Sequence, residues 1–428
     1  MSLPDETRPT MAPVATTRVT ASQFESRIDA TPAEMTTTAM TSAPISSATT
    51  SSTPRLLPSS ATTSPRRPLT SRAAVSTPAP RATDVHDVVF GALALRPGGS
   101  GVQTYARELV AAAASLAPEL SMAAVVQSDA VGELPTSVEP LTRPVSSGVR
   151  RALSGLRPVH TPGRVFHSLD VDLPLLRDGI TVSTVHDLSV FDTPWASSAL
   201  RARGERALLW RALNRADVLI AVSSFTAERI ADIFGRGAHV IPLAPASWAT
   251  PPSAEAVAEV RDRLDLPERF VLQVGTVEPR KDVALLAEAC AEADIPLVLA
   301  GAGSTGPDAP ASAHGLGYVA TAALPALYAA ATVTAYCSRY EGFGLPPIEA
   351  MACGGAVVAS AVGALPDVVA DGALLVAGHG PLAWARTLRE AADPETGAHL
   401  RERGPIAAGA LSWEATAAAT LEVYESTR

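Results

Sequence analysis

Residues 338–354, SRYEGFGLPPIEAMACG, form the most informative stretch of this chain. Two carboxylates, Glu341 and Glu349, flank a Gly-Phe-Gly turn and a Pro-Pro pair. Prolines suit the first turn of a helix, because the amides that they lack would be unsatisfied there. The stretch therefore predicts a tight turn followed by a helix whose first turn contains Pro346 and Pro347. The alternative is an ordinary helix whose first turn is acidic.

The predicted turn has the properties of an anion site. The residues expected to offer free backbone N–H groups there are Gly342, Phe343, Gly344 and Leu345. Such groups at the start of a helix bind anions, and the helix dipole adds to their attraction. Glu349, in the opening turns of the helix, can accept hydrogen bonds from both hydroxyls of a ribose. We interpret the stretch as part of a site for a nucleotide diphosphate.

Lysine is nearly absent from the chain: 33 of the 34 basic residues are arginine, and Lys281 is the only lysine. An ammonium is a compact point charge and a guanidinium a wide planar fork, so this lysine is expected where arginine cannot replace it. It follows the apolar run that ends at Gly275, in FVLQVGTVEPRKD. Arg280 and Lys281 are therefore predicted at the carboxyl end of a parallel strand, where open α/β sheets bind phosphates. The alternative for Lys281 is a solvated surface position.

From Val85 onward, short apolar runs alternate with helical patterns. Strands are predicted at residues 88–95, 122–126, 164–168, 180–186 and 217–222, and an amphipathic helix at 102–116. Periodicity lapses around residues 245–252, and apolar runs then return at 269–275, 296–300, 333–337, 356–360 and 373–377. This alternation predicts parallel, doubly wound sheets on either side of a linker. Ser412 is the predicted N-cap of the last helix.

Two further candidate sites lie in the first half of the chain. Gly98, Gly99 and Gly101 form a loop between a predicted strand and a predicted helix, so their backbone can approach a diphosphate or an acceptor closely. A plain connecting turn is the alternative. His186 ends an apolar run, and the carboxylate of Asp187 beside it is expected to orient the imidazole. A histidine with a purely structural role is the competing interpretation.

Together these segments resemble the retaining nucleotide-sugar glycosyltransferases of the GT-B type, in the large family (glycosyl transferases group 1, family 4) that includes bacterial mannosyl- and glucosyltransferases. The resemblance extends from about Val85 to the end and is most specific in GTVEPRKD, LYAAA, SRYEGFGLPPIEAMACGG, VVAS and SWEAT. It implies an α/β fold of two Rossmann-like domains facing a central cleft. Residues 85–247 would form the acceptor domain and 253–411 the donor domain, with a helix at 412–428 crossing back to the first.

The resemblance also implies roles for single residues. Arg280 and Lys281 would hold the donor diphosphate. Glu341 would lie beside the transferred sugar, Glu349 would bind the ribose, and His186 would hydrogen-bond a sugar hydroxyl.

One position departs from the family pattern. Many relatives carry an arginine directly after the strand-ending glycine, where this chain has Thr276. We expect Gly275 and Thr276 to lie at the donor and Arg280 to supply the missing charge.

The expected reaction is transfer of a hexose, with mannose as the first guess, from a nucleotide diphosphate sugar to a glycan or lipid-linked acceptor with retention. Stabilisation of the departing diphosphate would be the main catalytic device. No metal and no cofactor are expected. The alternatives are a nucleotide-sugar-binding protein without turnover, and an epimerase or a phosphorylase on the same fold. A phosphorylase needs a lysine for its pyridoxal cofactor, and the only lysine is already assigned.

The composition, with 47% hydrophobic residues and a net charge of -9, is typical of a soluble enzyme and argues against nucleic acid as a partner. Cys290, Cys337 and Cys353 lack metal-ligand spacing and indicate buried thiols in a reducing cytoplasm. No apolar run is long enough to span a membrane.

Arginines gather in the first half of the chain. Most helices like the basic one around Trp210 are ordinary surface elements, but such a face can also touch anionic lipid at the inner side of a membrane. The arginines in question are Arg201, Arg203, Arg206, Arg211 and Arg215, with Arg143, Arg150, Arg151, Arg157 and Arg164 nearby in sequence.

Residues 1–84 are rich in Ser, Thr, Pro and Ala, and their composition predicts a disordered extension. A transit peptide, or a start codon assigned too early, are the alternatives. Two other patterns are interpreted as decoys. GAGSTG at residues 301–306 mimics a dinucleotide-binding loop without the helix that should follow. Asp170 and Asp172 mimic a metal-binding acid pair and are expected to be solvated.

Overall fold

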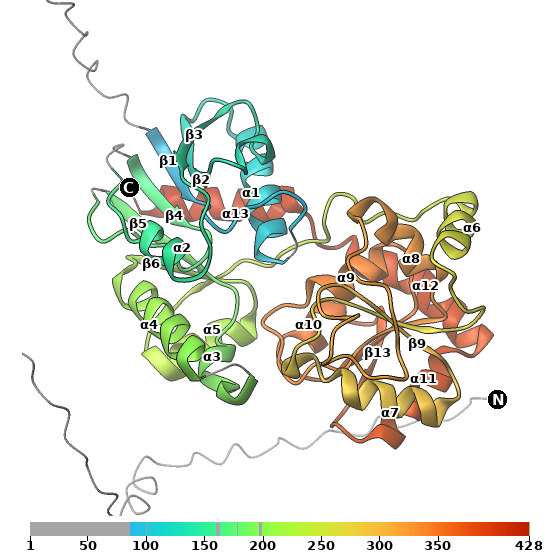
Figure 1. Cartoon of the computed structure of the whole chain (residues 1–428). Helices are drawn as coiled ribbons and strands as arrows, with labels where there is room; N and C mark the ends of the chain where they lie inside the picture. The colour runs from blue at the N-terminus through green and yellow to red at the C-terminus, as the bar shows by residue number, and fades with distance from the viewer. Residues whose placement is uncertain (1–85, 100, 160–162, 178, 197–198, 428) are drawn as a thin grey trace, which may run out of the picture. The chain divides into compact units, whose positions relative to one another are not determined.

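The structure is a computed structural model that describes residues 86–427, apart from 100, 160–162, 178 and 197–198. The predicted extension at residues 1–84 lies outside the described residues. The described part of the chain contains two parallel sheets that are joined by the segment 241–253 and covered by helices, as Figure 1 shows.

The first sheet has seven strands in the order β3-β2-β1-β4-β5-β6-β7. Its strands are β1 His86–Gly91, β2 Met122–Gln127, β3 Val138–Arg143, β4 Gly163–Ser168, β5 Ile180–Val185, β6 Val218–Ala221 and β7 His239–Val240. Its helices are α1 Val102–Leu116, α2 Gly148–Gly155, α3 Ser189–Asp192, α4 Ala199–Arg215 and α5 Ser224–Phe234.

The second sheet has six strands in the order β10-β9-β8-β11-β12-β13. Its strands are β8 Val271–Val274, β9 Leu297–Ala300, β10 His314–Gly315, β11 Val333–Tyr336, β12 Val357–Ser360 and β13 Ala373–Val376. Its helices are α6 Ala254–Arg263, α7 Val283–Ala293, α8 Leu324–Ala330, α9 Leu345–Ala352, α10 Leu365–Val369, α11 Pro381–Ala391 and α12 Pro394–Ala408.

Both sheets are buried on both faces, which explains their nearly continuous apolar strands. In β1, Val88 and Phe90 pack into a core cluster with α1, while Val89 between them packs on the opposite face against Leu213 of α4. In β8, neighbouring residues likewise belong to different clusters. The predicted fold class, two doubly wound Rossmann-like domains of the GT-B type, is confirmed.

The chain ends with α13, Trp413–Ser426, capped by the Ser412 side chain, which accepts a hydrogen bond from the amide of Ala415. This helix packs beside α1 of the first sheet (Figure 1), where Trp413 and Tyr424 join the core cluster of β1. The Tyr424 hydroxyl also contacts Nδ1 of the buried His167 at 2.5 Å. The end of the chain is therefore part of the core of the first sheet.

Several predicted boundaries were wrong. The first strand ends at Gly91 rather than at residue 95, and the apolar residues that follow it lie in a turn outside the sheet. Strands β3, β7 and β10 were not predicted. Strand β3 is an edge strand with Pro140 in it, and β7 and β10 have only two residues each, so none carries a clear apolar run.

Candidate functional site

The site is centred on two connections at the carboxyl ends of adjacent strands of the second sheet. Strand order reverses between β8 and β11, which are neighbours although 58 residues separate their ends. The segment after β8 forms the short 3₁₀-helix Pro279–Lys281, and the segment after β11 leads to Glu341. Ligands of open α/β sheets bind at such a reversal.

Lys281, Arg280 and Glu341 meet at this point. Lys281 Nζ lies 2.5 Å from Glu341 Oε1, and Arg280 Nη1 donates to Glu341 Oε2 at 3.2 Å. Ser338 Oγ donates to Glu341 Oε1 at 2.7 Å, while Arg280 Nη2 donates to Glu278 at 2.8 Å. The two cations therefore face two carboxylates, and the ammonium of Lys281 uses one of its three N–H groups on Glu341.

The charge state of this cluster follows from its burial. Removal from water by itself raises the pKa of Glu341, but the charges of Lys281 and Arg280 outweigh that effect and hold the pKa at about 2. Burial opposes the charge of Arg280, and the neighbouring Glu341 and Glu278 carboxylates still raise its pKa above the ordinary value. Both side chains are consequently ionised at neutral pH.

The turn that begins α9 supplies the second element of the site. Gly344, the N-cap of α9, has a φ of 107°, and a Cβ there would lie 2.5 Å from Leu365. Within the part of the chain that the structure describes, the amides of Gly342 to Leu345 donate no hydrogen bond. The side chains of Phe343 and Leu345 are buried in the core cluster of the first sheet. The turn is thus held by its side chains while its N–H groups stay available.

Glu349 lies in the second turn of α9 and is nearly fully buried. Burial raises its pKa to about 8, and the negative charge of Glu108 on α1 adds to the shift. Glu108 itself accepts hydrogen bonds from the amide and hydroxyl of Ser247. Glu349 therefore does not belong to the ionised cluster around Lys281.

His186 follows β5 and lies next to the turn, since a Cβ on Gly342 would be 2.0 Å from the His186 carbonyl oxygen. The prediction that Asp187 orients its imidazole was wrong. Nε2 of His186 lies 2.9 Å from the Leu169 carbonyl oxygen, whereas Asp187 accepts hydrogen bonds from Ser189. Because a carbonyl only accepts, Nε2 carries the proton and Nδ1 is left as the acceptor in the neutral ring.

The glycine loop connects β1 to α1, as predicted. Gly98 and Gly101 both have a φ of 65°, which favours glycine, and Gly101 precedes α1 without a side-chain cap. Gly99 packs against Gln103. The carbonyl of Gly98 accepts a hydrogen bond of 3.0 Å from the hydroxyl of Tyr318, which follows β10. The sequence offered no signal for this contact.

Gly275 and Thr276 lie directly after β8. Gly275 has a φ of 143°. Gly301 lies so close to it that a Cβ on Gly301 would be 2.4 Å from the carbonyl oxygen of Gly275. Three residues of the site were not predicted from the sequence. Ser338 donates to Glu341, and Glu278 accepts from Arg280. The hydroxyl of Ser223 donates to the carbonyl of Gly342 at 2.6 Å. Ser338 stands three residues before Glu341, and this spacing was its only signal.

The two decoy patterns have structural explanations. GAGSTG after β9 continues into turns rather than a helix. The expectation that Asp172 is solvated was wrong, because its side chain is buried. Arg151 donates hydrogen bonds to Asp172 at 3.1 Å and to Asp170 at 3.2 Å. Among the described residues, no group of three or more His, Cys, Asp or Glu side chains is placed to hold a metal ion, and no helix is long and apolar enough to cross a membrane.

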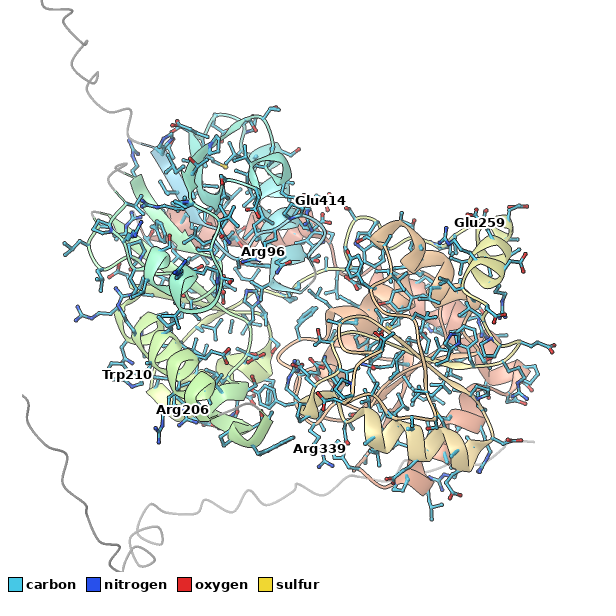
Figure 2. The ribbon with its side chains drawn as sticks, in the orientation of Figure 1. Arg96, Arg206, Trp210, Glu259, Arg339 and Glu414 are labelled. Carbon is cyan, nitrogen blue, oxygen red and sulfur yellow. The ribbon has the colours of Figure 1, made fainter. Side chains whose placement is uncertain are left out.

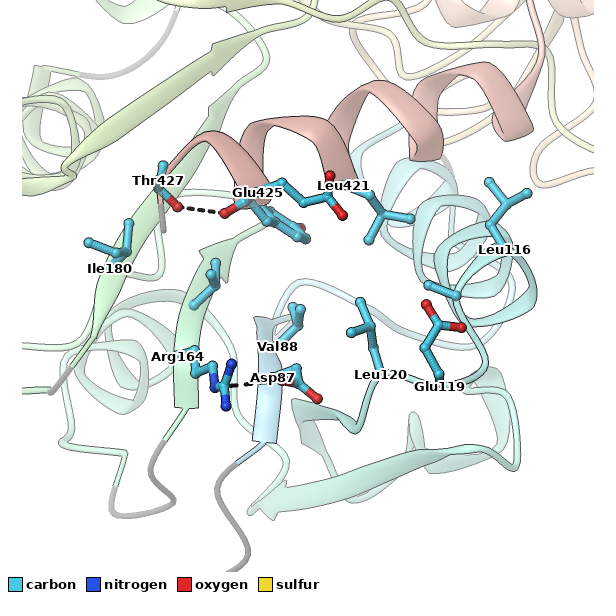
Figure 3. A pocket seen from close by; sticks show the side chains of 13 residues that line it. Asp87, Val88, Leu116, Glu119, Leu120, Arg164, Ile180, Leu421, Glu425 and Thr427 are labelled. Atoms are coloured by element: carbon cyan, nitrogen blue, oxygen red, sulfur yellow. Dashed lines mark hydrogen bonds and ion pairs between the residues drawn. The ribbon is translucent and has the colours of Figure 1, made fainter.

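A hollow of about 600 Å³ lies at the opposite edge of the first sheet, at the amino ends of β1 and β4 and against α13 (Figure 3). Its lining mixes the ion pair of Asp87 and Arg164 with apolar side chains such as Leu120 and Leu421. Because the glycine loop and His186 follow the carboxyl ends of their strands, this hollow is separate from the site.

Comparison with known proteins agrees with the fold. Residues 99–244 match the model of Glycosyltransferase Family 4, and residues 258–405 match that of Glycosyl transferases group 1. Among solved structures, the chain is similar to sucrose-phosphate synthase from Thermosynechococcus elongatus, with a TM-score of 0.63 and 24% identity over 79% of this chain and 98% of that one. It is also similar to WaaG, a glycosyltransferase involved in lipopolysaccharide biosynthesis, with a TM-score of 0.61 and 15% identity over 79% and 99% of the two chains.

Curated relatives are similar in sequence. The chain is 33% identical to O-antigen chain mannosyltransferase B of Escherichia coli, over 57% of this chain and 70% of that protein. It is 32% identical to D-inositol 3-phosphate glycosyltransferase of Xylanimonas cellulosilytica, over 59% of this chain and 66% of that protein. The alignments thus span about two thirds of the length of these relatives. The chain belongs to the glycosyltransferase family that these two models describe.

Proposed function

We propose that this protein transfers a hexose from a nucleotide diphosphate sugar to a glycan or lipid-linked acceptor, with retention and without a metal ion. The observation that carries the proposal is the convergence of Lys281, Arg280 and the unengaged amides of Gly342 to Leu345 at the reversal point of the second sheet. Positive potential there stabilises charge that grows on a departing diphosphate, which is a large catalytic effect in many enzymes.

In the proposed reaction, the bond between the anomeric carbon and the diphosphate oxygen breaks while the acceptor oxygen bonds to the same face of that carbon. The proton of the acceptor hydroxyl passes to the departing phosphate oxygen, and the nucleoside diphosphate is the second product. Lys281, with two N–H groups not used by Glu341, donates to the diphosphate. Glu341 lies beside the sugar and holds Lys281 in place.

Two other residues complete the donor site in this proposal. Glu349 binds the ribose hydroxyls, for which its burial at the second turn of α9 is suited. Nδ1 of His186, left as an acceptor, receives a hydrogen bond from a sugar hydroxyl. Mannose is the first donor sugar to test because the Escherichia coli relative is named a mannosyltransferase, and glucose is next because one neighbouring structure, Anabaena HepE, is described in complex with UDP and glucose.

The test is a panel of nucleotide sugars offered to the purified protein, with calorimetry for binding and release of nucleoside diphosphate for turnover. We expect one donor to bind and to be consumed. The anomeric carbon of the product should have the same configuration as in the donor, as judged from the NMR signal of the anomeric proton. Binding without consumption would instead identify a nucleotide-sugar-binding protein. Conversion to an isomeric nucleotide sugar without release of nucleoside diphosphate would identify an epimerase.

A further inference from the structure

A series of hydrogen bonds crosses the core of the first sheet close to His186. The hydroxyls of Tyr105 and Thr184 lie 2.7 Å apart, and Thr184 Oγ1 lies 2.7 Å from Nε2 of His167. Nδ1 of His167 lies 2.5 Å from the hydroxyl of Tyr424. All four side chains are buried, so a partner that is lost is not replaced by bulk water. We call Tyr105, Thr184, His167 and Tyr424 the buried network.

The members of the buried network come from four separate elements. Tyr105 is the fourth residue of α1, His167 lies on β4, Thr184 on β5 and Tyr424 on α13. Burial lowers the pKa of His167 to about 3, and the neighbouring His186 adds to the shift, so the ring of His167 is uncharged at neutral pH. An uncharged imidazole has one donor and one acceptor nitrogen, so both of its contacts can be hydrogen bonds. The network therefore joins the start of α1 to the last helix through two strands of the sheet.

Tyr105 is the member of the network that reaches the candidate site. Its ring lies against the imidazole of His186 with the centroids 4.8 Å apart and the planes at 79°, which is an edge-to-face contact. The ring of Trp413, on α13, lies 6.2 Å from the same tyrosine ring. The imidazole of His186 is thus held in two ways, by the Tyr105 ring and by the hydrogen bond of Nε2 to the Leu169 carbonyl.

The other contacts of the network lie just behind this pair of supports. Thr184 precedes His186 by two residues, and His167 precedes Leu169 by two residues. The hydrogen bond between Thr184 and His167 therefore ties together the two strand ends between which the imidazole is held. Removing this hydrogen bond would leave two buried polar groups without a partner at that place.

We propose that Tyr105 is a positioning residue for His186, and that the rest of the buried network keeps the Tyr105 ring against the imidazole. This role rests on the proposed function only in that a sugar hydroxyl is what Nδ1 of His186 binds. Tyr105 itself does not touch the substrate. It restricts the rotation of the imidazole, so that the acceptor nitrogen already has its bound orientation before the nucleotide sugar arrives. The last helix of the chain thereby contributes to recognition of the sugar.

The first test observes the imidazole directly and does not depend on any substrate. In the full chain with isotopically labelled histidines, nitrogen NMR reports the tautomer of His186, whose signals are assigned by comparison with His186→Gln. We expect a single Nε2–H tautomer in the unaltered protein. We expect Tyr105→Leu, which removes the ring, to give signals averaged over both tautomers. Averaged signals in the unaltered protein, or an unchanged tautomer in Tyr105→Leu, would overturn the proposal.

The second test compares two affinities by calorimetry, one for the nucleotide sugar and one for the matching nucleoside diphosphate. Only the nucleotide sugar carries the hydroxyl that His186 is proposed to bind. We expect Tyr105→Leu to weaken binding of the nucleotide sugar about tenfold, as for the loss of one hydrogen bond, and to leave the nucleoside diphosphate unaffected. Tyr105→Phe keeps the ring and should recover most of that affinity. A loss that is equal for both ligands would show a merely structural role.

A double variant tests whether Tyr105 acts through His186. In His186→Ala, the group that Tyr105 is proposed to hold is absent, so the further change Tyr105→Leu should cost no additional affinity for the nucleotide sugar. Additive losses in His186→Ala/Tyr105→Leu would instead mean that the two residues act independently, which contradicts the proposal.

Matched variants control for the loss of core packing. Phe270→Leu removes an equally buried ring directly before β8, at the amino end of the second sheet. Thr184→Val removes a hydroxyl of the network, whereas Thr334→Val removes a buried hydroxyl of β11 that has no hydrogen-bond partner within the described part of the chain. We expect Phe270→Leu and Thr334→Val to keep both affinities and Thr184→Val to lose several-fold for the nucleotide sugar alone. If thermal unfolding shows that Tyr105→Leu does not fold, the pair of threonine variants decides.

The two proposals fail in distinguishable ways. If no nucleotide sugar binds to the unaltered protein, the proposed function fails, and the NMR test still decides whether Tyr105 fixes the imidazole of His186. If the nucleotide sugar binds and is consumed while Tyr105→Leu and Phe270→Leu weaken it equally, the proposed function stands and the positioning role is refuted.

Discussion

Lys281 Nζ lies 2.5 Å from Glu341 Oε1, so the only lysine of the chain is paired with the first carboxylate of the Gly-Phe-Gly turn. The side chains are 11% and 10% exposed, which makes this a largely buried ion pair. Removing one partner of such a pair leaves the other charge without compensation. The alternative of a solvated surface position for Lys281 is therefore wrong, and we expect this lysine to contribute to stability as well as to the proposed catalysis.

Replacement of Lys281 tests both contributions. We expect Lys281→Ala to lower turnover by roughly two to three orders of magnitude, the usual cost of losing a preorganised electrostatic donor. We expect Lys281→Arg to recover part of that rate, because a planar fork differs from a point charge. Steady-state kinetics with the best donor would show this, and thermal unfolding should show a lower melting temperature for Lys281→Ala. Turnover near that of the unaltered protein would leave the diphosphate to Arg280 alone.

Replacement of Glu341 separates binding from turnover. Glu341→Gln removes the carboxylate that faces Lys281 and Arg280, so both cations become available to the phosphates. We expect nucleoside diphosphate to bind about tenfold more tightly, as the Coulomb interaction with a partly buried anion strengthens. Turnover should fall, because Glu341 no longer positions Lys281 beside the sugar. Weaker binding in calorimetry would contradict this arrangement of charges.

Glu349 gives the stability of the protein a characteristic dependence on pH. Its pKa is raised by burial from 4.5 to about 8, so the folded state binds more protons than the unfolded state between these values. The stability that the protonated Glu349 carboxyl contributes to the folded state is fully present below pH 4.5 and is lost as pH rises through 8. At about 1.4 kcal/mol for each unit of pKa, we expect Glu349→Gln to gain several kcal/mol of stability over the unaltered protein from pH 5 to pH 8.

Chemical unfolding at a series of pH values would measure that difference. The control is Glu259→Gln, at an exposed position on α6 that Figure 2 labels. If the free energy of unfolding depends on pH in the same way for the unaltered protein and Glu349→Gln, the pKa of Glu349 is not raised in the folded state. In calorimetry, Glu349→Ala should also weaken donor binding by about 1–3 kcal/mol, the cost of losing a buried hydrogen-bond partner.

Chelation tests the proposed independence from metal ions. We expect activity to survive EDTA, since the proposed positive potential comes from Lys281, Arg280 and backbone amides. The assay is release of nucleoside diphosphate before and after dialysis against the chelator. Complete loss of turnover that added magnesium or manganese restores would refute this part of the proposal.

Removal of residues 1–80 tests the role expected for the N-terminal segment. Large hydrophobic residues, which a core requires, are scarce in this segment, so we expect donor affinity and melting temperature to stay unchanged. Calorimetry and thermal unfolding of the shortened chain would check this. A fall of several degrees in the melting temperature would show that the segment packs on the rest of the protein.

Local patterns in the sequence were sufficient to predict most of the fold. The helix at 102–116, the Ser412 cap and the main strands were all predicted, because strands buried on both faces are continuously apolar and helix ends require particular residues. Edge strands were not predicted, because exposure to solvent on one side permits polar residues and proline, as in β3, and these interrupt the apolar pattern. The candidate residues at the two glycine-rich turns were also evident from chemistry alone.

The tertiary structure decided which of these residues meet. Only the order of strands places β8 beside β11, and this brings Lys281 to Glu341 across sixty residues of sequence. The same kind of long-range packing gives Leu169, rather than the adjacent Asp187, as the partner of His186, and makes Asp172 a buried partner of Arg151 instead of a solvated acid. Sequence by itself determines which groups can form hydrogen bonds and ion pairs and where a strand or helix is stable, because these depend on neighbours along the chain. Partners and burial depend on neighbours in space, which only the packing of the sheets determines.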